Sequence, residues 1–335
     1  MPKSAADLRR LALLFSALVI AVVAVRYLLA ATGLTSSNGE MGSAPKAGFH
    51  YEAVSGVFMQ DDPATDPATF DYSKHNFGLI DRSYDTDAAE DGDLSQWQRF
   101  ERYVQLLIRS STRGTLYKVI YMGRHGEGYH NVAEAFYGTK AWDDYWSKLD
   151  GNGTAFWSDA HLTAIGKEQA LEAHTFFGEQ LAWAKMPAPE RYYVSPLFRC
   201  LQTANLTFSG LKLPAERPFA PVVKEMMREV MGEHTCDRRS SRTVIRDAFP
   251  DWRIEPGFVE EDELWRADHR ETYTEHDVRS QALLDELFAH DQSTFVSFTA
   301  HSGTIASMLR VTHHREFKLP TGALIPVLIK ATRQS

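Results

Sequence analysis

Short apolar runs that alternate with longer amphipathic segments constrain the fold of this chain most. Residues 118–122 (KVIYM) and 294–299 (TFVSFT) are short, apolar and partly β-branched or aromatic, which is typical of buried strands. We predict further strands at residues 191–194, 221–224 and 323–331, and we place the last one at a sheet edge because it contains Pro326. Helical spacing of apolar residues predicts helices at 94–109, 163–183, 197–208, 272–290 and 304–311.

This alternation predicts an α/β fold with a mostly parallel sheet and helices on both of its faces. Residues 49–93 are rich in Asp, Pro and Tyr and show little periodicity, so we expect an irregular arm there. The chain has 44% hydrophobic and 24% charged residues, which excludes a disordered or collagen-like protein. Its net charge of −8 lacks the overall basic field of a nucleic-acid-binding protein.

The amino-terminal region contains a long apolar segment outside this pattern. Residues 11–31 carry one charge, Arg26, and about 20 apolar residues are enough to cross a bilayer. Lys3, Arg9 and Arg10 precede the segment, which favours a cytoplasmic amino end. We expect an uncleaved signal anchor, because the run is longer than the apolar core of most signal peptides. A signal peptide cleaved near residues 30–31 is the alternative.

These observations predict three regions and a location for the folded part. We expect residues 1–34 to form the hydrophobic signal anchor or signal peptide, residues 35–48 a linker, and residues 49–335 the folded domain. Either interpretation puts the domain in a lumenal or extracellular space, anchored to the membrane or secreted. The sequons at Asn152 and Asn205 are compatible with glycosylation there. Cys200 and Cys236 would then either pair or stay as two free thiols.

Residues suited to binding an anion follow four of the predicted strands. The sequence RHGEGYHN begins at Arg124, SPLFR spans 195–199, Arg228 and Glu229 follow the third strand, and AHSG spans 300–303. Ligands of open α/β sheets bind at the carboxyl ends of the strands. Arginine donates two parallel hydrogen bonds to phosphate oxygens, and a neutral imidazole is a phosphoryl nucleophile. The pattern therefore predicts a phosphate site built without a metal or another cofactor.

These motifs resemble the histidine phosphatase superfamily, which has the phosphoglycerate mutase-like fold. The resemblance rests on RHGEGYHN, SPLFRCLQTA, REVMGEHTCDRR, EDELW and AHSGTI, and it runs from about residue 49 to the carboxyl end. It is strongest to fungal and plant phosphoglycerate mutase-like proteins with an RHGxGxHN motif.

The resemblance implies a role for each matching residue. His125 would be the nucleophile that becomes phosphohistidine, and Glu229 would donate the proton to the leaving oxygen. The phosphate pocket would be lined by Arg124, Arg199 and His301, with Asn131 supporting it.

Several neighbouring residues keep alternative interpretations. Glu225, Glu127 and Asp237 are rivals of Glu229 as the proton donor. His130 could orient Asn131, contact the substrate or simply pack. The basic run at 238–242 could bind a second anionic group or form ion pairs. Adjacent residues point apart, so His313 and His314 are a poor metal pair.

The main functional hypothesis is a phosphatase that hydrolyses a small phosphorylated substrate through a phosphohistidine intermediate. A phosphomutase of the phosphoglycerate mutase type is the first alternative. It is less favoured, because the insertions that contact the substrate in known mutases have no match in this sequence. A catalytically silent phosphate-binding module is the second alternative, but His125, His301 and the acid are all present. The sequence does not identify the substrate.

Overall fold

A seven-stranded sheet forms the centre of the computed structural model, which describes residues 48–88 and 91–334. Its strand order is β1-β7-β2-β6-β3-β4-β5. Strands β2, β6, β3, β4 and β5 are parallel, whereas β7 is antiparallel to both β2 and β1. The bounds are β1 (Phe49–Ala53), β2 (Thr115–Arg124), β3 (Arg191–Val194), β4 (Pro221–Val223), β5 (Arg253–Ile254), β6 (Phe295–Ala300) and β7 (Leu324–Arg333). The predicted α/β fold is therefore confirmed.

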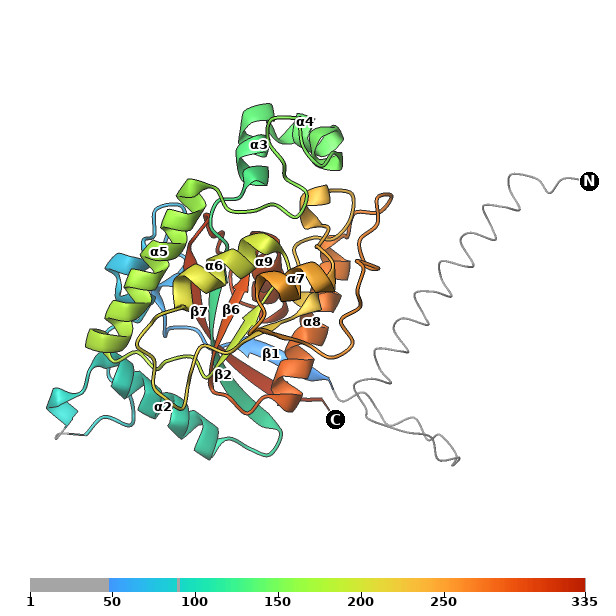
Figure 1. Cartoon of the computed structure of the whole chain (residues 1–335). Coiled ribbons are helices and arrows are strands. Elements are labelled where there is room, and N and C mark those ends of the chain that lie inside the picture. Colours follow the sequence, from blue (N-terminus) through green and yellow to red (C-terminus); the bar gives the residue numbers. More distant parts are fainter. Residues whose placement is uncertain (1–47, 89–90, 335) are drawn as a thin grey trace, which may run out of the picture. The chain divides into compact units, whose positions relative to one another are not determined.

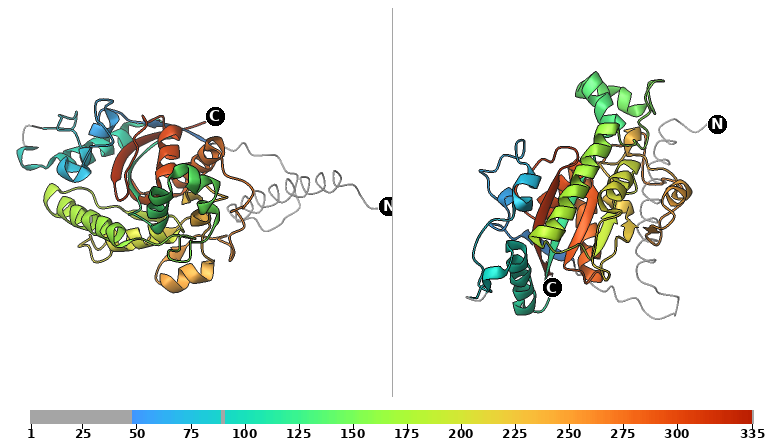
Figure 2. Two further views of the ribbon diagram at one scale, coloured as in Figure 1. Left: turned by 90° about the horizontal axis from the view of Figure 1, so that it is seen from above. Right: turned by 60° about the vertical axis from the view of Figure 1, so that its left-hand side comes forward.

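Helices cover both faces of this sheet (Figures 1 and 2). Helices α5 and α6 pack against each other over one face, and α8 and α9 do so over the other. The described helices are α2 (Gln96–Ser110), α3 (Tyr129–Tyr137), α4 (Thr139–Asp144), α5 (Ala164–Glu179), α6 (Phe198–Phe208), α7 (Arg242–Ala248), α8 (Tyr273–His290) and α9 (Ser302–Val311). All five predicted helices are present to within a few residues, and Thr163 caps α5 by accepting a hydrogen bond from Gly166 N.

The pleat of β2 explains how one strand serves both layers. Ile120 and Met122 are fully buried in the cluster that contains residues of α8 and α9. Tyr121 lies between them and points the other way, where its ring is 6.4 Å from that of Phe177 in α5 and 6.2 Å from that of Trp97 in α2. Successive side chains of a strand alternate between faces, so a continuous apolar run is needed when both faces are covered.

The prediction that residues 323–331 form an edge strand is wrong. Strand β7 lies between β1 and β2, because the predicted irregular arm begins with a five-residue strand, β1. However, β1 pairs with β7 only from Arg333 to Ile329. Pro326 pairs with Tyr121 of β2 and lies beyond the end of β1, so β7 tolerates a residue without an N–H there.

The rest of the arm forms short 3₁₀ turns, as its lack of periodicity suggested. They are η1 (Met59–Asp61), η2 (Tyr72–Lys74), η3 (Asn76–Gly78) and η4 (Asp91–Asp93). The arm is fixed through its aromatic residues: Phe77 is buried, and its ring lies 5.5 Å from that of Tyr121 and 5.2 Å from that of Phe176. Helices α3 and α4, which were not predicted from the sequence, project beyond one end of the sheet (Figure 1).

The predicted signal anchor and most of the linker fall outside the described residues. Among residues 48–88 and 91–334, no helix is both long and apolar enough to cross a membrane. The division at residue 49 therefore remains a prediction, although β1 begins at that position.

The loop after β2 touches the start of α5 backbone to backbone. A methyl group added at Gly126 would lie 2.1 Å from Gly166 O, and one added at Gly166 would lie 2.0 Å from Glu127 O. Thr163 N also donates to Glu127 O at 2.9 Å. Side chains at either glycine would separate the two segments, so these glycines fix the loop that carries His125.

Candidate active site

Strand register places His125 and His301 side by side. Arg124 of β2 is the partner of Ala300 in the adjacent parallel strand β6, so the residues that follow them leave the sheet together. His125 N donates to Ala300 O at 3.0 Å, and the two imidazole rings are 5.1 Å apart. Both side chains are essentially fully buried. The structure thus brings together the two histidines that the sequence analysis selected.

The neighbours of His125 determine which of its nitrogens can react. Its Nδ1 lies 2.7 Å from Gly126 O, and a carbonyl can only accept, so Nδ1 carries the proton. Burial lowers the pKa of His125 well below its usual value, and the positive charges of Arg199 and Arg124 lower it further. The ring is therefore neutral, with its free electron pair on Nε2. This is the form in which an imidazole acts as a nucleophile.

His301 is held by a hydrogen bond at each ring nitrogen. Arg199 Nε donates to its Nδ1 at 3.2 Å, and its Nε2 lies 2.7 Å from Ser195 Oγ. Burial, followed by the charge of Arg199, lowers the pKa of His301 well below its usual value. Because Arg199 can only donate, the proton of the neutral ring is on Nε2 and is donated to Ser195. His301 and Arg199 therefore form one hydrogen-bonded unit beside His125.

Asp237 anchors Arg199 and a second arginine that the sequence analysis did not select. Its Oδ1 accepts from Arg199 Nη2 at 2.8 Å, and its Oδ2 accepts from Arg270 Nη1 at 2.9 Å. Burial opposes ionisation of Asp237, but Arg270 and Arg199 outweigh burial and hold its pKa below the usual value. Asp237 is therefore an ionised anchor for two guanidiniums rather than a proton donor. No sequence motif marks Arg270, which lies 33 residues away.

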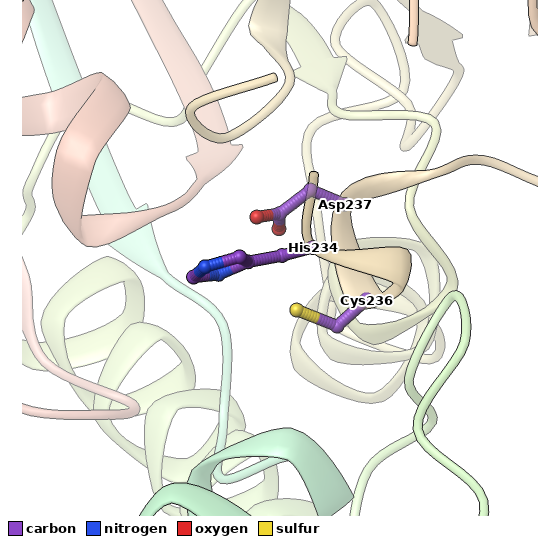
Figure 3. A group of neighbouring side chains, drawn as sticks. All are labelled: His234, Cys236 and Asp237. Atoms are coloured by element: carbon purple, nitrogen blue, oxygen red, sulfur yellow. The ribbon is translucent and has the colours of Figure 1, made fainter. Parts of the chain in front are cut away.

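Asp237 also belongs to a group with His234 and Cys236 whose potential ligand atoms lie within 4.8 Å of one another (Figure 3). All three come from one short segment around η8 (Thr235–Asp237). Both carboxylate oxygens already accept from arginines, and burial raises the pKa of the Cys236 thiol well above its usual value. Two guanidiniums beside a protonated thiol repel a cation, so the electrostatics of this group favour an anion nearby.

Arg124 approaches the same place from the end of β2. Its Nη1 donates to Leu319 O at 2.8 Å, whereas its buried Nε has no hydrogen-bond partner among the described residues. Burial lowers the pKa of Arg124, and the negative charge of Glu229 partly opposes this shift. An arginine held at one nitrogen with another left unsatisfied is suited to binding an oxygen of a ligand.

Glu229 lies at the amino end of α9, the helix that begins directly after His301. Its Oε2 accepts from Gly303 N at 3.0 Å, and its Oε1 accepts from Val230 N at 3.1 Å. A Cβ at position 303 would lie 2.1 Å from Oε1, so only glycine leaves room for this carboxyl group. The structure therefore places Glu229 at the start of the helix that His301 precedes.

The two remaining rival carboxyl groups are engaged elsewhere. Glu225 is buried and accepts from Arg228 Nη1 at 3.1 Å and from Arg239 Nε at 2.9 Å. Glu127 Oε1 accepts from Thr163 Oγ1 at 2.7 Å. Neither group forms a hydrogen bond with the amino end of α9 among the described residues, whereas Glu229 accepts from Gly303 N there. This geometry favours Glu229.

Asn131 and His130 lie in the first turn of α3. Asn131 Oδ1 accepts from Gly128 N at 3.0 Å, which leaves its amide nitrogen available as a donor. The His130 ring lies 5.4 Å from that of His125. The sequence is compatible with several roles of His130.

The basic run at 238–242 is tied down by ion pairs. Arg239 is buried and binds Glu225 together with four backbone carbonyls, and Arg238 binds Asp150 at 2.8 Å. These contacts support the ion-paired interpretation over a second anion site.

The two cysteines and the adjacent histidines also have defined surroundings. Cys200 and Cys236 are buried free thiols, and Cys200 Sγ donates to Ala300 O at 3.2 Å. His314 lies 3.1 Å from Asp61 Oδ1, whereas the ring of His313 lies 5.5 Å from that of His50. The two neighbouring imidazoles thus have different partners.

A groove of about 460 Å³ is found elsewhere in the domain, at the start of β1 and the end of α9. It is lined by Phe49, Asp285, Arg310 and His313, among others. Since α9 begins beside His301 and ends at this groove, the groove lies away from the histidine pair and takes no part in the site.

Comparison with known proteins identifies the family. Residues 120–324 match the histidine phosphatase superfamily (branch 1), and this range holds every site residue described above. The chain belongs to the histidine phosphatase superfamily, branch 1. The family that the sequence motifs suggested is confirmed.

Relatives of this superfamily member include fungal proteins. It is 55% identical over 282 residues to a "Probable phosphoglycerate mutase" of Arthroderma benhamiae, which covers 84% of each chain. It is 35% identical over 241 residues to a "Probable phosphoglycerate mutase" of Saccharomyces cerevisiae, covering 67% of this chain and 82% of that one. Among solved structures, an ecdysone phosphate phosphatase from Bombix mori matches with a TM-score of 0.40 and 18% identity, over 62% of this chain and 87% of that one.

Proposed function

We propose that this protein is a phosphatase that hydrolyses a small phosphomonoester through a phosphohistidine intermediate at His125. The observation that carries the proposal is the hydrogen bond between His125 Nδ1 and Gly126 O. It leaves the reactive electron pair on Nε2, in a buried site that also holds the guanidiniums of Arg124 and Arg199. Positive charge stabilises the equatorial oxygens of a transferring phosphoryl group.

The first chemical step forms a bond between His125 Nε2 and phosphorus while the bond from phosphorus to the leaving oxygen breaks. Arg124, Arg199, His301 and Asn131 would line the pocket around the phosphoryl oxygens. Glu229 would give its proton to the leaving oxygen, because an alkoxide is too basic to leave unprotonated. The anchoring of Arg199 by Asp237 and His301 means that the guanidinium is already placed before substrate binds.

In the second step water attacks the phosphohistidine. The Glu229 carboxylate takes a proton from that water, and the bond between phosphorus and Nε2 breaks to release inorganic phosphate and neutral His125. No step requires a metal ion, because cationic side chains supply the positive charge.

A phosphomutase is the second candidate, and the names of the two fungal relatives favour it. A mutase returns the phosphoryl group to the bound substrate instead of transferring it to water. The same pocket serves both reactions, so they are distinguished by the fate of the phosphohistidine.

The deciding experiment follows 3-phosphoglycerate and p-nitrophenyl phosphate with the full-length protein in buffer containing EDTA. We expect release of inorganic phosphate from p-nitrophenyl phosphate, lost in His125→Ala. Isomerisation of 3-phosphoglycerate without phosphate release would establish a mutase. Binding of phosphate with neither reaction would indicate a silent binding module.

We further propose that residues 11–31 anchor the protein in a membrane and that the catalytic domain is lumenal or extracellular. The apolar sequence supports this, and Asn152 is exposed in a turn, where its Oδ1 accepts from Thr154 N at 3.0 Å. Asn205 lies within α6 and is half-buried. A glycosidase-sensitive mass shift that is lost in Asn152→Gln would support this location, and an unglycosylated cytosolic protein would contradict it.

A further inference from the structure

His130 is a buried imidazole whose Nδ1 lacks a hydrogen-bond partner within residues 48–88 and 91–334. The residue is 9% exposed, and the Nδ1 atom itself is buried. Buried polar groups in folded proteins are nearly always paired, and an exception calls for an explanation such as a bound ligand or a catalytic role. If the imidazole only filled space, its replacement by an apolar ring would not lower the affinity for a ligand.

The ring is held where a ligand of His125 would meet it. It lies 5.4 Å from the His125 ring, which is 5.1 Å from the His301 ring. Position 128 is adapted to it, because a Cβ there would lie 2.7 Å from His130 Nδ1. Gly128 therefore gives space to the imidazole at the start of α3.

The other two imidazoles of this group have fewer free nitrogens. Both nitrogens of His301 are bonded, to Arg199 and Ser195. Nδ1 of His125 is bonded to Gly126 O, and its Nε2 is the proposed nucleophile. His130 is thus the imidazole with an N–H still to donate.

We propose that His130 binds the phosphoryl group directly, donating its ring N–H to a phosphoryl oxygen while His125 attacks the phosphorus. This deepens the proposed function and rests on it for the identity of the ligand. Burial, followed by the charge of Arg199, lowers the pKa of His130 well below its usual value, so the ring is neutral and carries one N–H. A neutral donor adds a hydrogen bond without a further cation beside the two arginines.

The test uses full-length His130→Phe, which keeps an aromatic ring of similar size and removes both nitrogens. The probes are inorganic phosphate and orthovanadate, with dissociation constants measured by calorimetry. We expect affinity for both anions to fall about 10- to 100-fold, as for a lost hydrogen bond to a charged group. Unchanged affinity in a folded His130→Phe protein would overturn the proposal.

Two amide variants keep the proposal testable if His130→Phe does not fold. The side-chain nitrogen of Asn can replace Nδ1 of His130, and that of Gln can replace Nε2. We expect one of His130→Asn and His130→Gln to bind phosphate at least about tenfold more tightly than the other. Equal affinities would overturn the proposal.

His161→Phe is the matched control, because this imidazole is exposed and stacks on Phe198, with the two rings 4.6 Å apart. Its phosphate affinity should equal that of the unmodified protein. Binding measurements also separate the two proposals. An unmodified protein that binds phosphate without hydrolysing any phosphomonoester refutes the phosphatase, and the variants still decide the role of His130. A protein that binds neither anion refutes both.

Discussion

Arg199 and Asp237 form an ion pair with an Nη2–Oδ1 distance of 2.8 Å, and both side chains are at most 3% exposed. The pair joins α6 to the segment after β4 and, together with the bonds from Arg199 to His301 and to Cys236 O, fixes the central guanidinium of the site. Asp237 also binds Arg270, which makes it the common counter-ion of two arginines.

Asp237→Asn should therefore destabilise the protein by about 3–5 kcal/mol, because two buried guanidiniums lose their counter-charge. Urea unfolding of both proteins at pH 7 measures the difference. The pKa of Asp237 is lowered in the folded state, so its contribution is complete above about pH 4, the usual range for Asp. It is lost as the pH falls through the folded pKa. A variant as stable as the unmodified protein at pH 7 would refute the anchor role.

His125→Asn should reduce turnover of p-nitrophenyl phosphate by at least about 10³-fold, because the nucleophile is lost while the pocket stays polar. Steady-state kinetics measure the loss, and circular dichroism checks that the fold is retained. Residual activity near that of the unmodified protein would show that another group receives the phosphoryl group.

Glu229→Gln should slow hydrolysis of alkyl phosphates by about 10²–10³-fold and affect p-nitrophenyl phosphate little, because p-nitrophenolate leaves without a proton. A series of leaving groups with graded pKa values measures this dependence. The matched control is Glu225→Gln, which breaks the buried contacts to Arg228 and Arg239. It should cost about 3 kcal/mol of stability and leave the leaving-group dependence unchanged. The opposite pattern would make Glu225 the donor.

Stability should fall in mild acid because of the three histidines at the site. Burial, with Arg199 as the next cause, lowers the pKa of His125, His130 and His301 well below usual values. The unfolded chain takes up protons on these histidines near pH 6.5 and the folded protein does not, so protonation favours the unfolded state below that pH. The free energy of unfolding is therefore at its full value above about pH 6.5 and declines below it. Each contributes up to about 1.4 kcal/mol per pH unit. Urea unfolding at pH 7 and 5.5 measures this decline, and equal stability at both would contradict it.

Thiol accessibility provides a check on the surroundings of the site. Cys200 and Cys236 are buried free thiols, and burial raises the pKa of both. A thiol-specific reagent should therefore label neither in the native protein and both after denaturation without reductant. Absence of labelling after denaturation would reveal a disulfide.

Much of the site could be predicted because parallel strands end at one edge of a sheet. This rule alone was enough to expect His125, Arg199 and His301 near one another, since each follows a strand of the parallel set. It also placed Glu229 after β4. Residues on strand ends are fixed by backbone pairing, which short apolar runs reveal in a sequence.

Other parts of the site depend on side-chain partners that no periodicity records. Asp237 was considered as a proton donor, but its contacts with Arg199 and Arg270 depend on how two loops fold. The edge position of β7 was predicted wrongly because β1 is only five residues long and lies in a segment without clear alternation. The pairing of β1 with β7 joins positions about 280 residues apart, which local patterns cannot show.

The contact between Gly126 and Gly166 bears on how this protein can evolve. Each glycine faces backbone atoms of the other segment, so a larger residue at one position cannot be compensated by trimming a side chain at the other. In related sequences we therefore expect the neighbouring positions to vary while both of these positions stay glycine. A descendant that lost either glycine would have to rebuild the whole turn and the start of α5 together.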